Sequence, residues 1–520
     1  MARFPCVVAF FVLWFAPVFA AEIADPFEAP PGAVPATRID EFVLQKLQEE
    51  GIQPARPCSD AVFIRRVYVD VAGTIPDPEE VREFLADEAP DKRAKLINRL
   101  LESEQFADYC SLKWCDVLRV KAEYPIKLWP NAVQAYHGWV RESIRQNRPY
   151  DEFVRALLTS TGSNFRVPPV NFYRAVQDRS PEGLAGAVAL TFMGTRIQHW
   201  PESRRQGMAA FFSRVAYKPT AEWKEEIIYV DPAAAGPLEA AFPDGRGVTV
   251  PAGKDPRKVF ADWLISEENP WFARAAVNRT WSWLMGCGII HEPDDIREDN
   301  PAVNPELLAF LEKEFVASGY DMRHLWRLIL SSRTYQQSSI ARSDAPRVET
   351  LFAVYPVRPM DAEVLIDALC KITGNDEGYS SPIPEPFTWV PETHSTVALS
   401  DGSITSRFLE LFGRPARDTG LESERNSNPT AAQRRHMLNS THVHDKITRG
   451  PNLRRVLYGR ADGKGGAVRE AYLLILSREP TAEELKVVAE YATREGANRR
   501  AAAMDVIWAL LNSKEFLYRH

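Results

Sequence analysis

The chain has 520 residues and a formal net charge of −7, and 45% of its residues are hydrophobic. This length corresponds to roughly two to four domains, and the composition is that of an ordinary globular protein, which excludes wholesale disorder. The slightly acidic balance argues against a nucleic-acid binder that depends on bulk positive charge. We therefore expect a folded protein of several domains with no nucleic-acid partner.

Residues 1–20 have the three-part pattern of a secretory signal peptide. A short positive start, Met1–Arg3, precedes the apolar run Val7–Phe19, and Val18 and Ala20 supply small residues before a cleavage point. The run is too short to span about 30 Å of hydrocarbon. The pattern predicts cleavage after Ala20 or Ala21, a periplasmic or secreted location, and no stable membrane insertion after cleavage.

The cysteines predict neither a disulfide framework nor a metal centre. Removing the signal peptide leaves an odd, sparse set without a C-x-x-C motif: Cys58, Cys110, Cys115, Cys287 and Cys370. We interpret them as small core residues and expect no cofactor.

Helical spacing dominates the first half. Residues 21–38 are rich in Pro and Ala and predict a linker, and a helix from Ile39 to Gly51 follows. Asp77-Pro78-Glu79-Glu80 is a helix start, because Asp caps the helix, Pro fits the first turn and Glu80 stands three residues after the cap. Further helices are expected at 90–103, 105–120, 131–147, 150–160, 182–194 and 203–215.

Two strands interrupt the helices. Glu226–Val230 and Gly247–Val250 have strand composition, so residues 220–253 are interpreted as a short β excursion and domain boundary. The second half is again helical, with starts at Asn269-Pro270 and Asn304-Pro305. The prediction is a mainly α protein with two irregular multi-helix domains, 39–219 and 254–518, separated by 220–253.

The helix at 270–285 is apolar on nearly every face, yet it contains Asn278 and Arg279. A buried guanidinium must pair with a carboxylate, and the nearest rich source of acids is 291–300. One interpretation is a polar binding pocket formed by Asn278, Arg279, Asp294, Asp295 and Arg297. The other, which the sequence favours, is a structural ion pair that ties the loop to its helix.

Two other clusters contain chemically useful side chains. His436, His442 and His444 are candidate metal ligands, since an extended segment would place His442 and His444 on one side. No other spacing requires a metal, however, and surface histidines are common.

Glu422 and Glu424 would share one side of an extended segment beside Arg425, as a general acid and base do. A solvated loop is the simpler interpretation. No nucleophile elbow or phosphate-binding glycine motif is present.

Several short sequence segments together resemble those of a known family. They are Phe63–Pro76, Asn269–Arg274 with Val277–Trp281, Ser318–Asp321, Ser331–Gln336, Phe412–Pro415 and Leu510–Phe516. In this order they resemble the planctomycete-type exported proteins that pair a cytochrome-associated domain of unknown function with its usual C-terminal partner domain. The resemblance implies an export setting and an association with sulfatase-like proteins and polysaccharide breakdown, but no reaction.

The chain departs from that pattern where relatives carry thiols. A C-x-x-C-H segment of relatives is replaced by Gly194–Glu202, and their C-E-C-E-R segment by Leu421–Arg425, both without cysteine. Because covalent haem needs thiols, we expect no c-type haem.

Three function classes remain. The sequence favours an exported, non-catalytic protein that binds a partner protein or an extracellular polysaccharide. The alternative is a hydrolase of extracellular polysaccharide, sulfated or not, that uses Asp294 and Asp295 or Glu422 and Glu424, provided these acids converge on one cleft. A redox protein is the least favoured class.

Overall fold

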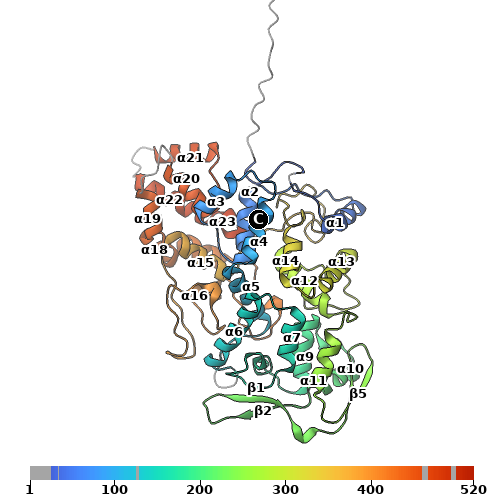
Figure 1. The fold of residues 1–520 in the computed structure, drawn as a ribbon. Coiled ribbons are helices and arrows are strands. Elements are labelled where there is room, and N and C mark those ends of the chain that lie inside the picture. Colours follow the sequence, from blue (N-terminus) through green and yellow to red (C-terminus); the bar gives the residue numbers. More distant parts are fainter. Residues whose placement is uncertain (1–24, 33, 124–127, 459–465, 494–498) are drawn as a thin grey trace, which may run out of the picture.

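The computed structural model describes residues 25–520 except 33, 124–127, 459–465 and 494–498. The predicted signal peptide lies outside the described residues. Of the described residues, 53% are helical and 7% lie in strands, which confirms the mainly α fold with a short β segment (Figure 1).

The helices of the first half follow the predicted order. They are α1 (Arg38–Glu49), α2 (Asp60–Val67), α3 (Pro78–Ala86), α4 (Lys92–Leu101), α5 (Glu104–Val117), α6 (Pro130–Arg145), α7 (Tyr150–Thr159), α8 (Asn171–Ala175), α9 (Pro181–Met193) and α10 (Glu202–Ala209). At the start of α3, Asp77 and Glu80 form the predicted capping box. A short π-helix, η1 (Tyr68–Ala72), continues α2.

The second half is also helical. Its helices are α11 (Pro256–Leu264), α12 (Phe272–Met285), α13 (Pro305–Ala317), α14 (Met322–Leu330), α15 (Ala362–Thr373), α16 (Arg407–Leu411), α17 (Ala431–Asn439), α18 (Thr441–Arg449), α19 (Pro451–Tyr458), α20 (Gly466–Leu476), α21 (Ala482–Ala492), α22 (Arg499–Leu511) and α23 (Lys514–Leu517). The Asn304 side chain caps α13 by accepting a hydrogen bond from the Leu307 amide.

The predicted strands both exist, and each has an antiparallel partner that the sequence did not predict. β3 (Glu226–Val230) lies between β1 (Gly162–Ser163) and β2 (Val215–Pro219). β5 (Gly247–Val250) pairs with β4 (Leu238–Ala241). The expected helix at 203–215 is α-helical to Ala209 and continues as a 3-10 turn over Ala210–Phe212, before the chain enters β2.

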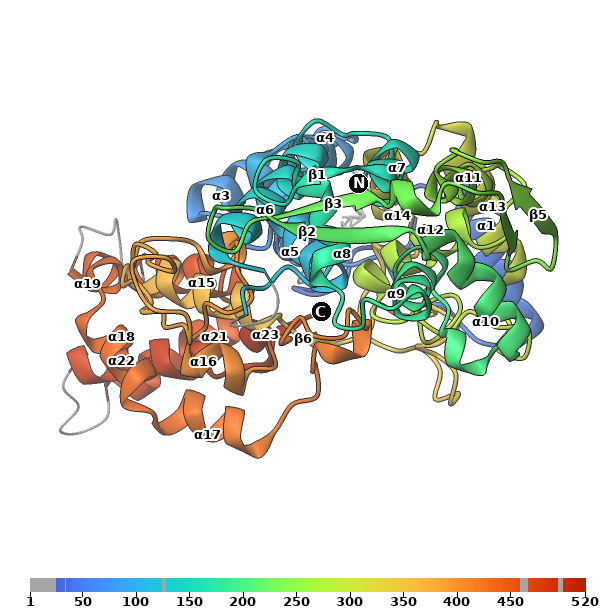
Figure 2. The same ribbon diagram turned by 90° about the horizontal axis from the view of Figure 1, so that it is seen from below.

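Two hydrophobic cores form, and their division does not follow the β segment. The larger core contains buried residues from Ile39 to Tyr355, including Ile228 and Val250 of the β segment, so it continues across residues 220–253. The smaller core is built mainly from residues 360–516. Figure 2 shows the second group of helices, α15 to α22, as a separate bundle beside the rest of the chain.

The C-terminal residues return to the centre of the molecule. β7 (Tyr518–Arg519) pairs antiparallel with β6 (Arg358–Pro359), directly before α15. Figure 1 places the chain end beside α2 and α4. Within the described residues, no helix has the length and apolar character needed to cross a membrane.

Candidate functional site

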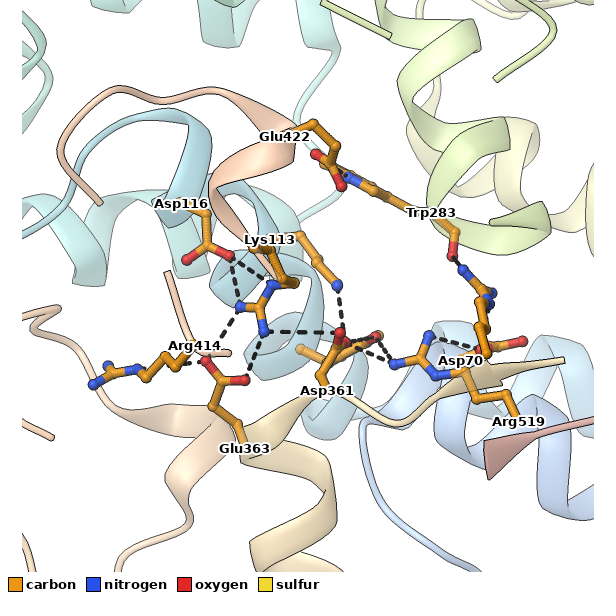
Figure 3. A network of polar contacts seen from close by, with 12 residues as sticks. Asp70, Lys113, Asp116, Trp283, Asp361, Glu363, Arg414, Glu422 and Arg519 are labelled. Atoms are coloured by element: carbon orange, nitrogen blue, oxygen red, sulfur yellow. Dashed lines mark hydrogen bonds and ion pairs between the residues drawn. The ribbon is translucent and has the colours of Figure 1, made fainter. Parts of the chain in front are cut away.

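Where the two cores meet, charged side chains form a buried cluster that we call the junction network (Figure 3). Its members are Asp70, Lys113, Asp116, Arg358, Asp361, Glu363, Arg414, Arg417, Arg425 and Arg519. Most of these side chains are more than nine-tenths buried. Buried charges need partners of opposite charge, because removing each ion from water costs on the order of several kcal/mol in a protein.

Asp361, in the turn before α15, is one centre of the network. Its Oδ2 atom accepts from Arg519 at 2.7 Å and from the Tyr109 hydroxyl at 2.7 Å, and it lies 2.8 Å from Lys113 Nζ. Burial alone would raise the pKa of Asp361, but Arg519, Lys113 and Arg425 hold it well below its ordinary value. Asp361 therefore joins α5, α15 and the C-terminal strand as a permanent anion.

Asp70, in η1, is the second centre. Its carboxylate accepts hydrogen bonds from the Tyr335 and Tyr355 hydroxyls at 2.9 and 2.7 Å, and from Arg519 at 3.0 Å. Because Arg519 bonds both Asp70 and Asp361, the last residues of the chain link the two centres.

Arg425 is the third centre. Its guanidinium donates to Glu363 at 2.7 Å and to Asp116 at 2.7 Å, and Arg417 reaches the other oxygen of Asp116 at 2.8 Å. Burial alone would lower the pKa of Arg425, whereas Glu363, Asp116 and Asp361 raise it well above its ordinary value. Every carboxylate of the network thus has a cationic partner, an arrangement suited to holding the two cores together rather than to moving protons.

A small pocket of about 50 Å³ borders the network at Asp361 and Arg425. Its apolar wall is formed by Met360, Leu365, Phe412, Met437 and Leu517, and its polar lining includes Asn426, Asn428, Gln433, Arg434 and Tyr518. The Arg434 side chain is exposed and makes no ion pair or hydrogen bond with another described residue. The pocket combines an apolar wall with several hydrogen-bonding groups.

The predicted ion pair in α12 exists. Arg279 is 1% exposed and donates to Asp294 at 2.8 Å and to the Thr191 carbonyl at 2.8 Å. The Asn278 side chain exchanges two hydrogen bonds with the backbone of Ile290. These contacts tie the loop after α12 to the helix and to α9, as the structural interpretation requires.

The other two residues of that predicted set lie elsewhere. Asp295 and Arg297 form a partly exposed pair at 3.0 Å, and Arg297 also reaches Asp299 at 3.3 Å. They do not approach Arg279 in any contact that the structure shows.

One residue from each predicted acidic segment does converge. Asp294 accepts from the backbone amide of Glu422, and the Glu422 carboxylate accepts from the Trp283 indole at 3.0 Å. Burial raises the pKa of Glu422, and the neighbouring Asp294 adds to this effect. Glu424 instead accepts from the backbone amides of Asp418 and Thr419 at 2.8 and 3.1 Å, closing its own loop.

The histidines are arranged differently from the expectation. His442 and His444 lie on helix α18, so the assumption of an extended segment is wrong, and residues two apart on a helix face different ways. His436, on α17, faces His442 across 3.3 Å. In the described part of the chain, no group of three or more His, Cys, Asp and Glu side chains could hold a metal ion.

Sequence reasoning missed most of the junction network. A signal was available, since Asp70 is the single charge in the apolar run Val67–Ala72, and Lys113 stands between Leu112 and Trp114 on a buried helix face. The isolated charges indicate buried partners, but their pairing across some 250 to 450 residues of chain leaves no mark in the sequence.

Comparison with protein-family models gives two matches. Residues 38–198 match PSCyt2, a protein of unknown function (DUF1549), and residues 256–492 match PSD1, a protein of unknown function (DUF1553). A search of curated proteins and a search of solved structures found no match. The two models cover both halves of the chain in the order that the sequence segments indicated, so this protein belongs to the family that pairs the PSCyt2 and PSD1 domains.

Proposed function

We propose that the chain is an exported, non-catalytic binding protein for an extracellular polysaccharide, which it holds at the cavity beside Arg425 and Arg434. The observation that carries this proposal is the lining of this pocket of about 50 Å³, which joins an apolar wall to amides and to the exposed Arg434 guanidinium. A guanidinium without a protein partner suits an anionic substituent, because it can donate two parallel hydrogen bonds to a sulfate or carboxylate.

The contacts of the candidate acids Asp294 and Glu424 agree with a non-catalytic role. Asp294 is neutralised by Arg279, and Glu424 is occupied by backbone amides. Glycoside hydrolysis needs two carboxylates that face one substrate. Export is the part of the proposal that rests on the pattern of residues 1–20.

The proposal is tested with Arg434→Ala. We expect the variant to bind a sulfated galactan at least about tenfold more weakly than the unchanged protein, because a charge-assisted pair contributes roughly 1.5–3 kcal/mol. The measurement is a thermal-shift titration, with the same galactan after desulfation as the ligand control.

Arg435→Ala is the matched control, since Arg435 is the next residue of α17, is also exposed and does not line the cavity. Equal losses in the two variants would contradict a site at this cavity. Absence of any galactan binding would favour an exported partner protein as the occupant.

A hydrolase is the second candidate function, and Glu422 is the observation that favours it. Its carboxyl is partly buried against Trp283, and its pKa is raised. A carboxyl that retains its proton can act as a general acid. If the chain hydrolyses polysaccharide, Glu422→Gln should abolish the release of reducing ends.

The stability of Glu422→Gln follows from the direction of the pKa shift. The folded state binds the proton more tightly than the unfolded state, so ionised Glu422 costs stability at neutral pH, and this cost disappears as the pH falls through the folded pKa. We expect Glu422→Gln to be more stable than the unchanged protein at pH 7, by on the order of 0.5 kcal/mol, with the difference vanishing near pH 4. Urea denaturation at both pH values measures this, and a less stable variant at pH 7 would contradict it.

A further inference from the structure

Three side chains outside the junction network form a linear chain. His436 lies in the last turns of α17, His442 in the first turn of α18, and Glu377 follows α15. His436 Nε2 is 3.3 Å from His442 Nδ1, and His442 Nε2 is 2.9 Å from Glu377 Oε2. The two ring nitrogens of His442 thus serve two different partners.

Glu377 fixes the protonation pattern of the His442 ring. Its carboxylate is 7% exposed and is also held by Lys446 Nζ at 3.1 Å. A carboxylate accepts, so in the neutral ring His442 Nε2 carries the proton and Nδ1 keeps the lone pair that faces His436. A metal-ligating histidine donates its second ring N–H to a carboxylate in the same way.

The distance between the two imidazoles fits a shared metal ion. Two nitrogens that are each about 2.0–2.1 Å from a tetrahedral Zn²⁺ lie about 3.3–3.4 Å apart. A direct hydrogen bond between the rings would normally be shorter, since protein N–H donors lie about 2.7–3.2 Å from their acceptors. The separation of 3.3 Å fits a shared metal ion and also fits a long hydrogen bond between the rings, so the titration below distinguishes the two.

The surroundings hold both rings and leave space beside them. The Phe408 ring contacts His436 and His442 edge-on, with centroids 5.7 and 5.8 Å away, and it stacks on Phe412 at 4.1 Å. Both histidines line an open cavity of about 970 Å³. Its lining includes the oxygen-bearing side chains of Ser406, Asn439, Ser440 and Thr441, together with the cations Arg407, Lys446 and Arg449.

We propose that His436 Nε2 and His442 Nδ1 bind one divalent transition-metal ion, for which Zn²⁺ is the best-suited species, with Glu377 as the carboxylate that orients His442. Imidazole suits Zn²⁺, and the remaining positions take water or oxygen atoms of a ligand in the adjoining cavity. The site has two protein ligands, in agreement with the absence of a three-ligand group among the described residues. It is independent of the proposed polysaccharide site, which lies in the other cavity.

The test is calorimetric titration of Zn²⁺ into the full chain after treatment with a chelator. We expect one Zn²⁺ per chain, at least about thirtyfold weaker binding in His436→Ala and in His442→Ala, and about ten- to a hundredfold weaker binding in Glu377→Gln. His444→Ala is the matched control, since His444 lies on the same helix but is exposed and does not line the cavity. Its affinity should equal that of the unchanged protein.

The proposal is overturned if no Zn²⁺ binds, or if His436→Ala and His442→Ala bind it as tightly as the unchanged protein. It is also overturned if Cys370→Ser loses the ion while both histidine variants keep it, because the Cys370 thiol lies 3.4 Å from Lys446 Nζ, which in turn contacts Glu377. Thermal unfolding without metal checks that each variant folds, and His436→Gln and His442→Gln replace any alanine variant that does not. A tetrahedral visible absorption spectrum after loading with Co²⁺, lost in the histidine variants, is the second readout.

Discussion

Replacing Asp361 by asparagine is expected to lower the free energy of unfolding by about 3–5 kcal/mol, the cost of breaking a buried ion pair from one side. The substitution leaves Lys113 and Arg519 buried beside a neutral amide. Because these cations come from α5 and from the C-terminal strand, the loss should also weaken the coupling between the two cores. Urea denaturation followed by fluorescence measures the free energy and shows whether one transition splits into two.

Asp299→Asn is the control for this experiment. Asp299 also pairs with an arginine, Arg297, but its side chain is 75% exposed. An exposed pair contributes about 0–1 kcal/mol, so this variant should unfold almost like the unchanged protein. Similar losses in the two variants would mean that burial does not set the strength of the junction network.

The pH dependence of the Asp361 effect follows from the sign of its shift. The folded-state pKa lies well below 3.8, so the stabilisation is complete above the unfolded-state pKa and is lost as the pH falls through the folded-state value. The difference between the unchanged protein and Asp361→Asn should therefore stay constant from pH 5 to 8 and shrink below about pH 4. A difference that changes with pH near neutrality would contradict this assignment.

Arg279→Met is the second substitution with a large expected effect, again about 3–5 kcal/mol. Methionine fills similar space, but Asp294 then remains as a buried carboxylate close to the partly buried Glu422. The carbonyls of Leu190 and Thr191 also lose their donor. Thermal and urea unfolding of the full chain measure the loss.

A double variant separates the effect of the buried charge on stability from the effect of packing. Adding Asp294→Asn to Arg279→Met removes the unpaired charge, so part of the lost stability should return, while the uncapped carbonyls of α9 keep the recovery incomplete. Arg297→Met provides the surface control in the same loop, with an effect of no more than about 1 kcal/mol. If the double variant is less stable than Arg279→Met alone, the buried Asp294 charge is not the source of the loss.

Much of the fold was predictable because local signals and helix boundaries coincide. Pro at first-turn positions, Asn and Asp caps and apolar stripes predicted most helices of both halves, and β-branched runs predicted β3 and β5. The partner strands β2 and β4 were missed because their composition is not strongly strand-like. Their strand conformation depends on pairing with β3 and β5 rather than on their own strand propensity.

The candidate sites were less predictable. The need of Arg279 for a carboxylate followed from its position in an apolar helix, and Asp294 meets that need. The hydrolase hypothesis required Asp294 and Glu422 to lie close together, but the sequence did not predict that they would. The sequence also did not predict that His436 faces His442. Both depend on how loops and helices far from one another in the sequence pack together.

The sequence by itself determined the family, the helical character and the requirement that isolated charges in apolar helices be neutralised, because each depends on residues close together in the chain. Only the tertiary structure decided which charges neutralise which. Asp70, Asp361 and Arg519 meet across hundreds of residues, and a Coulomb interaction depends on distance in space and on burial, neither of which local sequence encodes.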